Sequence, residues 1–347
     1  MLIVSPQLVL KIEKVKAPGS LVYVNDTMEG FYRKGENPGY VYIDKEGNET
    51  SDPKILERIA GLVIPPDWRE VWICKKVLGH IQATGRDSKG RKQYIYHKRW
   101  GEHLSRQKYD NLKEFGEILP KIRQQVNADL RKRSWNKKKI TALAVKLMDE
   151  SYIRVGNKMY QKMNGTYGLT TLRRKHLKVK ENHLILQFIA KSGKLMKVKI
   201  NHPVLRKQLK LCSELPGHEL FRYQEDNRSE ALNSSDINEY LREVSGINIS
   251  SKNFRTWGGT VLTVKFEQVA RQICVVNPKR KLETTLVQLV AKELNNTVSV
   301  CRKYYIHPKV LKVVVSGKFK DYLLQKVNFP DNGYSTAELT VLNIISE

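Results

Sequence analysis

The segment KITALAVKLMDESYIRVG, residues 139–156, has the apolar spacing of a helix, and helical patterns recur through most of the chain that follows it. Its apolar residues recur at intervals of three and four and therefore lie on one side of a helix. We expect this helix to run to about Arg154 and to stop at Gly156, because glycine is common where a helix ends. Arg154 is thus expected at a helix end. The predicted buried stripe consists of Ile140, Leu143, Ala144, Leu147, Met148 and Ser151.

A hairpin and further helices follow. Residues 183–200, HLILQFIAKSGKLMKVKI, have the composition of two strands joined at Lys191-Ser192-Gly193-Lys194, which places Lys191 near the tip. A helix capped by Ser235 is expected to stop at Gly246. Another begins around KNFRTWGG, and spaced leucines predict a third that ends at Asn295-Asn296.

Residues 20–100 instead have the composition of a small β-rich domain. The stretch 108–135 then becomes helical in pattern, with an interruption at Pro120. We therefore predict an N-terminal domain over residues 1–105, of which 1–20 form a leader, and a mainly helical domain over 106–347. The predicted strand segments are LVYVN, GYVYID, VWICKK, GHIQATG and KQYIYHKRW.

The charge of the chain points to a polyanionic partner. The 347 residues include 62 Lys and Arg against 35 Asp and Glu, a net charge of +27. Such an excess favours nucleic acid through counterion release, although charge alone does not separate DNA from RNA. The four cysteines have neither zinc-ligand nor disulfide-framework spacing. No stretch approaches the roughly 20 apolar residues of a membrane span, so we expect a soluble, intracellular protein.

Moving a phosphodiester without a metal requires three kinds of side chain. They are a nucleophile, cations that neutralise the charged intermediate, and an acid for the departing sugar oxygen. Arg suits the second task because its fork pairs with phosphate oxygens. The sequence has no Gly-rich nucleotide loop and no acidic cluster suited to Mg²⁺, so we expect no cofactor and no metal.

Five stretches within roughly residues 25–315 resemble the type IB DNA topoisomerases, in particular their compact bacterial and poxvirus-like branch. The first resembles the family's N-terminal DNA-binding domain. The others resemble the segments with its first catalytic Arg, its catalytic Lys, its Lys-x-x-Arg pair and its nucleophilic Tyr. In order, they are RIAGLVIPPDWREVWIC with GHIQATGRDSKGRKQYIYHKRW, ESYIRVGNKMY with GTYGLTTLRRKHLKV, FIAKSGK, KNFRTWGGT and LNNTVSVCRKYYIHP.

The resemblance implies an isomerase that relaxes supercoiled DNA through a transient 3′-phosphotyrosyl link, with specific roles for four residues. Tyr305 would attack the phosphorus. Tyr304 is a rival, but the motif places the nucleophile immediately before Ile-His-Pro. Arg154 and Arg255 would hold the non-bridging oxygens, and Lys191 would protonate the 5′ oxygen.

Asn296 departs from the pattern of many relatives, which have His nine residues before the tyrosine. Asn can donate a hydrogen bond to a phosphate oxygen but carries no positive charge. The bacterial branch commonly has this Asn, so we interpret the change as a mark of the subfamily. The pair Asn295-Asn296 is equally typical of a helix C-terminus, and both interpretations can hold together.

Five more residues match DNA-contacting positions or lie beside the site. Gln93, Tyr94 and Tyr96 match the N-terminal domain's contacts, and Tyr160 matches a phosphate-contacting tyrosine. Tyr94 and Tyr96 share one face of a strand, which a packed aromatic ladder would also explain. Lys252 lies one helical turn before Arg255 and can reach the same phosphate, or it is a solvated lysine.

Taken together, the sequence predicts an α+β protein. It combines a small antiparallel β-sheet domain with a larger, mainly helical catalytic domain, and the two form a C-shaped clamp around duplex DNA. We expect a monomer that prefers supercoiled DNA and works in the cytoplasm, at the nucleoid if the source is bacterial. One alternative is a tyrosine recombinase. That group typically has His-x-x-Arg where this chain has Lys252 to Arg255, and a helical clamping domain where this chain is predicted to be β-rich. The other is a DNA-binding protein that has lost the reaction.

Overall fold

The computed structural model describes residues 20–36, 38–181, 183–225, 228–323 and 333–347, without the side chains of residues 104–108 and Tyr160. The predicted leader, apart from Ser20, lies outside these residues. The chain divides into two compact units, Met1–Lys108 and Tyr109–Glu347, called unit 1 and unit 2 below.

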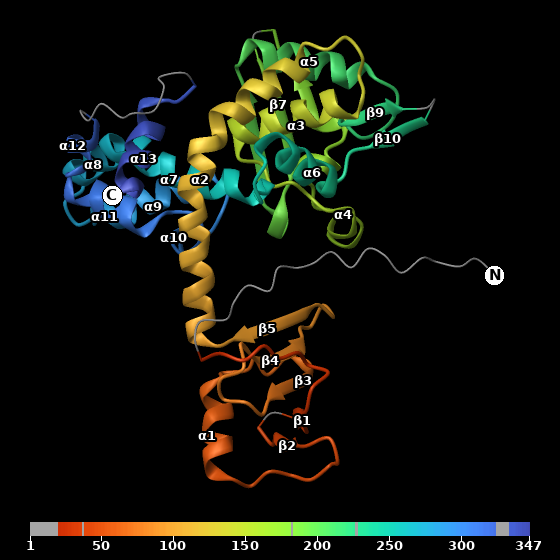
Figure 1. Cartoon of the computed structure of the whole chain (residues 1–347), viewed down its shortest axis with the longest axis vertical. Helices are drawn as coiled ribbons and strands as arrows, with labels where there is room; N and C mark the ends of the chain where they lie inside the picture. The colour runs from red at the N-terminus through yellow and green to blue at the C-terminus, as the bar shows by residue number, and fades with distance from the viewer. Residues whose placement is uncertain (1–19, 37, 182, 226–227, 324–332) are drawn as a thin grey trace. The chain divides into compact units, whose positions relative to one another are not determined.

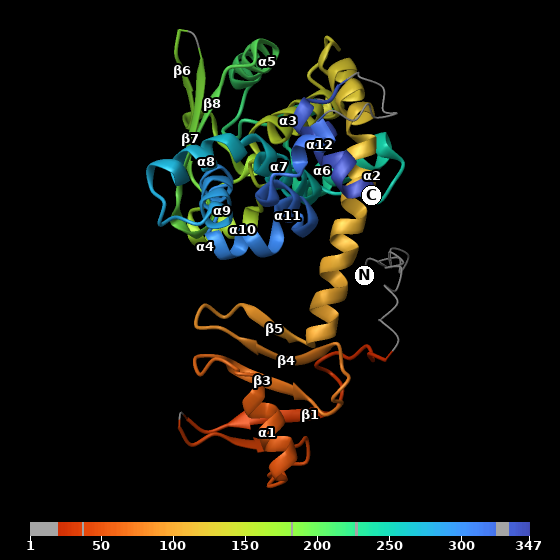
Figure 2. The ribbon, with the colours of Figure 1, turned by 90° about the vertical axis from the view of Figure 1, so that its left-hand side faces the viewer.

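Unit 1 is built on a five-stranded antiparallel sheet with the strand order β2-β1-β3-β4-β5 (Figures 1 and 2). Helix α1 (Pro53–Gly61) packs on one face, where Ile59 meets Phe31 and Ile73 in a buried core. This sheet confirms the predicted β-rich region. The strands are β1 (Gly30–Lys34), β2 (Val41–Ile43), β3 (Arg69–Cys74), β4 (Ile81–Arg86) and β5 (Lys92–Tyr96).

The first predicted strand is wrong. LVYVN contributes only an isolated bridge between Val22 and Gly79, and the strand that does pair with β3 is β1, which the sequence analysis missed. Its first residue, Gly30, hides the signal because glycine weakens a strand pattern. The glycine is required by packing, since a Cβ there would lie 2.1 Å from Nε1 of Trp72.

Helix α2 (Lys98–Leu130) is continuous, so the predicted interruption at Pro120 is wrong, as is the extension of the preceding strand beyond Tyr96. A proline removes the N–H that would bond to the carbonyl four residues earlier. Here that carbonyl belongs to Gly116, and the hydroxyl of Tyr334 donates to it at 2.9 Å. The lost bond is thus replaced from outside the helix.

Unit 2 is mainly helical, with α7 at its centre (Figure 1). Helix α7 is buried along most of its length and contacts α3, α6, α8, α9, α11 and α13. The helices are α3 (Lys137–Ser151), α4 (Lys158–Asn164), α5 (Pro203–Glu214), α6 (Ser234–Ser245), α7 (Ser251–Lys265), α8 (Glu267–Val276), α9 (Leu282–Glu293), α10 (Val298–Tyr304), α11 (Pro308–Ser316), α12 (Phe319–Leu323) and α13 (Thr336–Ser346).

Two small sheets complete unit 2. The predicted hairpin is confirmed: β7 (Leu184–Ile189) pairs with β8 (Leu195–Ile200), and the turn between them contains Lys191. A third strand, β6 (Leu177–Val179), pairs with β7 and was not predicted. The second sheet is the hairpin of β9 (Arg222–Glu225) and β10 (Arg228–Ala231).

Helix α3 confirms the predicted stripe, since Ile140, Leu143, Ala144, Leu147 and Met148 are all buried and Ser151 is half-buried. Its predicted end is wrong, because the helix stops at Ser151 and Arg154 lies beyond it. Tyr152 ends the helix in the left-handed conformation, with φ 54°, and its N–H still bonds to the carbonyl of Met148 at 2.9 Å.

The cap of α6 also differs from the prediction. Asn233, not Ser235, is the N-cap, and its side chain accepts the N–H of Ser235 at 2.8 Å. Asn and Ser are both good N-caps, so the pattern alone could not choose between them. The predicted stop at Gly246 is confirmed by its left-handed φ of 78°.

Glu338 makes the stability of unit 2 depend on acidity. Burial opposes its ionisation, but Arg123 and Ser335 outweigh burial and lower its pKa to about 2. A group whose pKa is lowered by folding stabilises the folded state above its unfolded pKa and loses that contribution as the pH falls. We therefore expect the free energy of unfolding to fall between about pH 4.5 and pH 2, by roughly 3 kcal/mol from this group. Urea denaturation of the wild type and of Glu338→Gln across that range measures the effect. Identical pH dependence of the two proteins would contradict it.

Candidate active site

Arg255 is a buried cation in the second turn of α7, with 4% of its surface exposed. Its Nη1 donates to the carbonyl of Tyr152, and its Nη2 donates to the carbonyl of Leu294 at 2.8 Å. These carbonyls follow α3 and α9, so the ends of two helices fix the guanidinium. Its buried Nε has no partner among the described residues.

Among the residues that the structure describes, no Asp or Glu forms an ion pair with Arg255. Burial, followed by repulsion from Arg154, lowers its pKa to about 10, so the group keeps its proton at neutral pH. A buried cation with an unused N–H is costly unless an anion completes its environment. The arrangement is therefore suited to binding an anionic oxygen.

Arg154 and Asn296 form the second part of the site. Nη2 of Arg154 donates to Oδ1 of Asn296. The backbone of Asn296 is held by a 2.8 Å bond from its N–H to the carbonyl of Ala291. With Oδ1 engaged, Nδ2 of Asn296 is a buried donor that lacks an acceptor in the described structure. The site thus presents two unused donors, this Nδ2 and Nε of Arg255.

Tyr305 follows the last residue of α10, and its N–H bonds to the carbonyl of Cys301 at 2.9 Å. The guanidinium of Arg255 lies 5.0 Å from the centre of its ring. Its backbone packs directly on α7, where a Cβ on Gly259 would lie 2.4 Å from the Tyr305 carbonyl oxygen. Tyr304, in contrast, is 45% exposed. The structure therefore places Tyr305 beside Arg255.

Within the described residues, neither Lys191 nor Lys252 is joined to this cluster by a hydrogen bond or ion pair of its side chain. Both side chains are exposed and make no hydrogen bond or ion pair within the part of the chain that is described. The hairpin of Lys191 is nevertheless tied to the site, because Nδ2 of Asn295 lies 3.5 Å from the carbonyl oxygen of Leu195.

The predicted DNA-contacting residues of unit 1 lie on edge strand β5. Tyr94 and Tyr96 are 44% and 45% exposed, and their rings stack with centres 5.8 Å apart. Gln93 donates to Asp87 at 2.9 Å. The side chain of Tyr160 lies outside the described residues, although its backbone belongs to α4.

The sequence analysis missed the backbone groups that hold the site. The carbonyls of Tyr152 and Leu294 carry no side-chain signal, so no motif could reveal them. Gly258 and Gly259 do carry one, because adjacent glycines inside a helical pattern indicate close packing. A Cβ on Gly258 would lie 2.2 Å from the ring of Tyr152.

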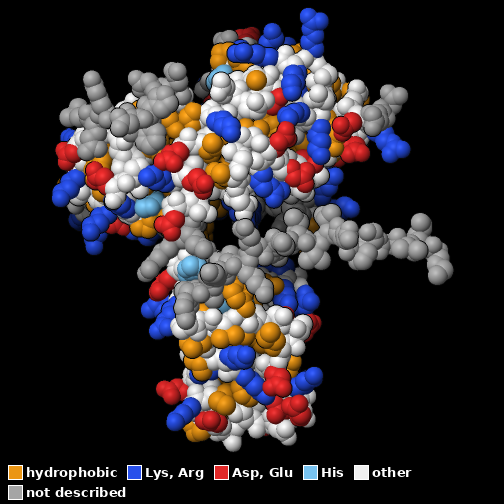
Figure 3. Space-filling view, in the orientation of Figure 1, with side chains coloured by type: hydrophobic (Ala, Val, Ile, Leu, Met, Phe, Trp, Pro, Cys, Tyr) orange, Lys and Arg blue, Asp and Glu red, His pale blue; other side chains and the backbone are white. Residues whose placement is uncertain are grey.

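On the face shown in Figure 3, the Lys and Arg side chains are scattered among acidic and apolar ones. Part of the basic run 131–139 is used internally: Lys132 pairs with Asp129 at 2.6 Å, and Lys137 pairs with Asp236 at 2.7 Å.

Two family models of DNA topoisomerases match this chain, one mainly in unit 2 and one in unit 1. The family model described as the eukaryotic DNA topoisomerase I catalytic core matches residues 97–325, and that of the bacterial DNA topoisomerase IB N-terminal domain matches residues 39–87. A DNA topoisomerase 1B of Acanthamoeba polyphaga mimivirus is 31% identical over 287 residues, which cover 80% of this chain and 85% of the relative. A DNA topoisomerase 1B of Vaccinia virus (strain Copenhagen) is 22% identical over 300 residues, with coverages of 85% and 88%. Among the described helices, none has the length and apolarity needed to span a membrane.

Proposed function

The chain belongs to the type IB DNA topoisomerases, enzymes that relax supercoiled DNA by cutting and resealing one strand, and on that basis we propose that Tyr305 is its nucleophile. The observation that carries this assignment is the position of the Tyr305 ring, 5.0 Å from a buried guanidinium that has an unused N–H. A phosphate bound to Arg255 would be next to the phenol.

In the proposed reaction, the phenolic oxygen of Tyr305 bonds to phosphorus as the bond from phosphorus to the 5′ oxygen breaks. The phenol loses its proton and the 5′ oxygen gains one, giving a 3′-phosphotyrosyl link and a free 5′-hydroxyl. Resealing reverses these steps. Because the phosphotyrosyl link keeps the energy of the broken diester, the reaction requires neither ATP nor a metal, and supercoiling itself drives relaxation.

We assign the charge that develops on the phosphate to three residues. Arg154 and Arg255 hold the non-bridging oxygens as cations, and Asn296 donates a neutral hydrogen bond. Donors already fixed in place stabilise a transition state most effectively, because no reorganisation is needed when the charge forms. Arg255 is fixed by its bonds to the carbonyls of Tyr152 and Leu294. The backbone of Asn296 is fixed by its bond to the carbonyl of Ala291.

Lys191 is assigned as the acid for the 5′ oxygen. This role rests on the family resemblance of FIAKSGK. The ammonium is exposed at the hairpin tip, and the bond between Asn295 and Leu195 keeps the hairpin close to the Asn296 turn.

We further propose that residues 1–105 contribute DNA contacts and residues 106–347 the chemistry. Gln93, Tyr94, Tyr96, Tyr160 and Lys252 are the proposed contacts outside the reacting phosphate. The enzyme is proposed to act as a monomer that favours supercoiled DNA, in the cytoplasm and at the nucleoid if the source is bacterial. A recombinase would instead need paired sites, so relaxation of a plasmid by monomeric protein distinguishes the two.

Mapping the cleaved phosphate on an end-labelled duplex tests the reaction. We expect covalent attachment to the 3′ side of the break, in the presence of EDTA and without ATP. A 5′-phosphotyrosyl product, or a strict Mg²⁺ requirement, would overturn the proposal.

The free donor of Asn296 leads to a graded prediction. Asn296→Ala removes both the donor and the acceptor for Arg154, and we expect single-turnover cleavage to slow by roughly 10²-fold, the usual effect of losing one such donor. Asn296→Asp keeps the acceptor but adds a negative charge next to the phosphate, so its loss should be at least as large. Rates measured at saturating DNA check both values. If Asn296→Ala cleaves at the wild-type rate, Asn296 has no part in catalysis.

A further inference from the structure

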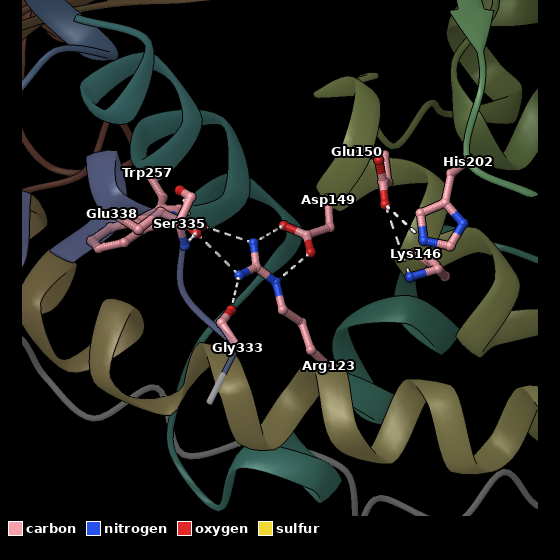
Figure 4. Close-up of polar contacts among 9 residues, drawn as sticks. All are labelled: Arg123, Lys146, Asp149, Glu150, His202, Trp257, Gly333, Ser335 and Glu338. Carbon is pink, nitrogen blue, oxygen red and sulfur yellow. Dashed lines mark hydrogen bonds and ion pairs between the residues drawn. The ribbon is translucent and has the colours of Figure 1, made fainter. Parts of the chain in front are cut away.

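A partly buried ionic network around Arg123 joins α2, α3 and α13 of unit 2 (Figure 4). Nε and Nη2 of Arg123 donate to the carboxylate of Asp149 at 2.7 and 3.1 Å, and Nη2 and Nη1 donate to Glu338 at 2.8 and 3.3 Å. Nη1 also donates to the carbonyl of Gly333 at 2.7 Å. These five bonds match the five N–H groups of a guanidinium, so the orientation of Arg123 is fixed.

One arm of the network leads through α3 to Arg255. Asp149 lies in the last turn of α3, three residues before Tyr152, whose carbonyl accepts from Nη1 of Arg255. Tyr152 has φ 54°, an unfavourable conformation that its surroundings must impose. Its ring also lies directly on Gly258 of α7. Arg123 is thus bonded to the end of α3 that leads into this carbonyl.

The other arm leads through α13 to the same residue. Glu338 accepts from Nε1 of Trp257 at 3.3 Å, and Trp257 follows Arg255 by two positions on α7. The Trp257 ring lies against Gly116 of α2, where a Cβ would be 2.5 Å from it. The network therefore bonds both to α7, the helix that carries Arg255, and to the end of α3, where the Tyr152 carbonyl accepts from Arg255.

We propose that Arg123 and Glu338 are positioning residues of the cleavage reaction, which keep Nε of Arg255 directed at the scissile phosphate. The inference rests on the proposed function, because it assigns a purpose to the orientation of Arg255. Glu338 also stabilises unit 2 at neutral pH, but apolar side chains often stabilise a fold as well as an ion pair does, so stability alone does not require this network.

Glu338→Gln tests the proposal, because it keeps the size of the side chain and removes its charge. We expect single-turnover cleavage at saturating DNA to slow about tenfold while the dissociation constant for DNA stays unchanged. In an Arg255→Lys background the same substitution should have little further effect, because Glu338 acts through Arg255. A purely structural role predicts no such dependence on Arg255.

Asp236→Asn is the matched control. Asp236 and Glu338 are each 6% exposed, each is the third residue of its helix and closes a capping box, and each pairs with a cation. The partner of Asp236 is Lys137, at the start of α3 rather than at its Arg255 end. We expect Asp236→Asn to lower the melting temperature and to leave the cleavage rate unchanged.

Three outcomes would overturn the positioning role. The first is a wild-type cleavage rate in Glu338→Gln. The second is a slowing of cleavage in Asp236→Asn as large as that in Glu338→Gln. The third is a double variant, Glu338→Gln with Arg255→Lys, whose rate is reduced by the product of the two single reductions. If Glu338→Gln does not fold, Asp149→Asn carries the same test through the other arm of the network, since it keeps the size of the side chain and removes its charge. Absence of a covalent complex in the wild type would overturn the proposed function itself, and the positioning role with it.

Discussion

Tyr305→Phe is expected to abolish covalent capture of DNA and relaxation, with no measurable residual cleavage. The substitution removes only the phenolic oxygen that bonds to phosphorus, and no other group in the site takes over that bond. The phenyl ring keeps its place 5.0 Å from the Arg255 guanidinium, so folding and DNA binding should change little. A suicide substrate that traps the covalent complex, with a parallel binding assay at several salt concentrations, measures both properties.

Tyr304→Phe is the control for this experiment. Tyr304 is the adjacent tyrosine and is 45% exposed, whereas Tyr305 packs against the core of unit 2. We expect Tyr304→Phe to cleave within about threefold of the wild type, an energy difference of about 0.7 kcal/mol. Covalent capture by Tyr305→Phe that is lost in Tyr304→Phe would reverse the assignment.

The fold class was predictable because its signals are local. The five predicted stripe residues, Ile140, Leu143, Ala144, Leu147 and Met148, recur at helical spacing, and all are buried. The hairpin turn at Ser192-Gly193 has two residues in the left-handed region, which its sequence suits. The continuity of α2 was not predictable. The bond that replaces the one lost at Pro120 comes from Tyr334, 218 residues beyond Gly116, and no local pattern encodes it.

The candidate site was predictable only as a set of residue types. The resemblance supplied Arg154, Arg255 and Tyr305, and the structure adds the orientation of their groups. That orientation comes from backbone carbonyls and from the Arg123 network, whose members lie on helices distant in sequence. Lys191 shows the opposite case, because its motif was clear and its side chain has no contact with the site within the described residues.

Arg255→Ala is expected to slow cleavage at saturating DNA by about 10³-fold, which corresponds to ~4 kcal/mol of transition-state stabilisation. Arg255 is the more deeply buried of the two cations, and water cannot readily replace it at the phosphate. Arg255→Lys should recover only part of the rate, because an ammonium keeps the charge but cannot hold both carbonyls and the phosphate in one plane.

Stability must be measured beside these rates, because Arg255 also satisfies the carbonyls of Tyr152 and Leu294. Each buried carbonyl left unpaired costs roughly 1–3 kcal/mol, so Arg255→Ala should melt at a lower temperature than the wild type. Assays well below that temperature separate the two effects. A slow but folded Arg255→Ala protein that still binds DNA supports a role in the transition state. Wild-type cleavage by the folded variant would show that the unused Nε of Arg255 does not face the scissile phosphate.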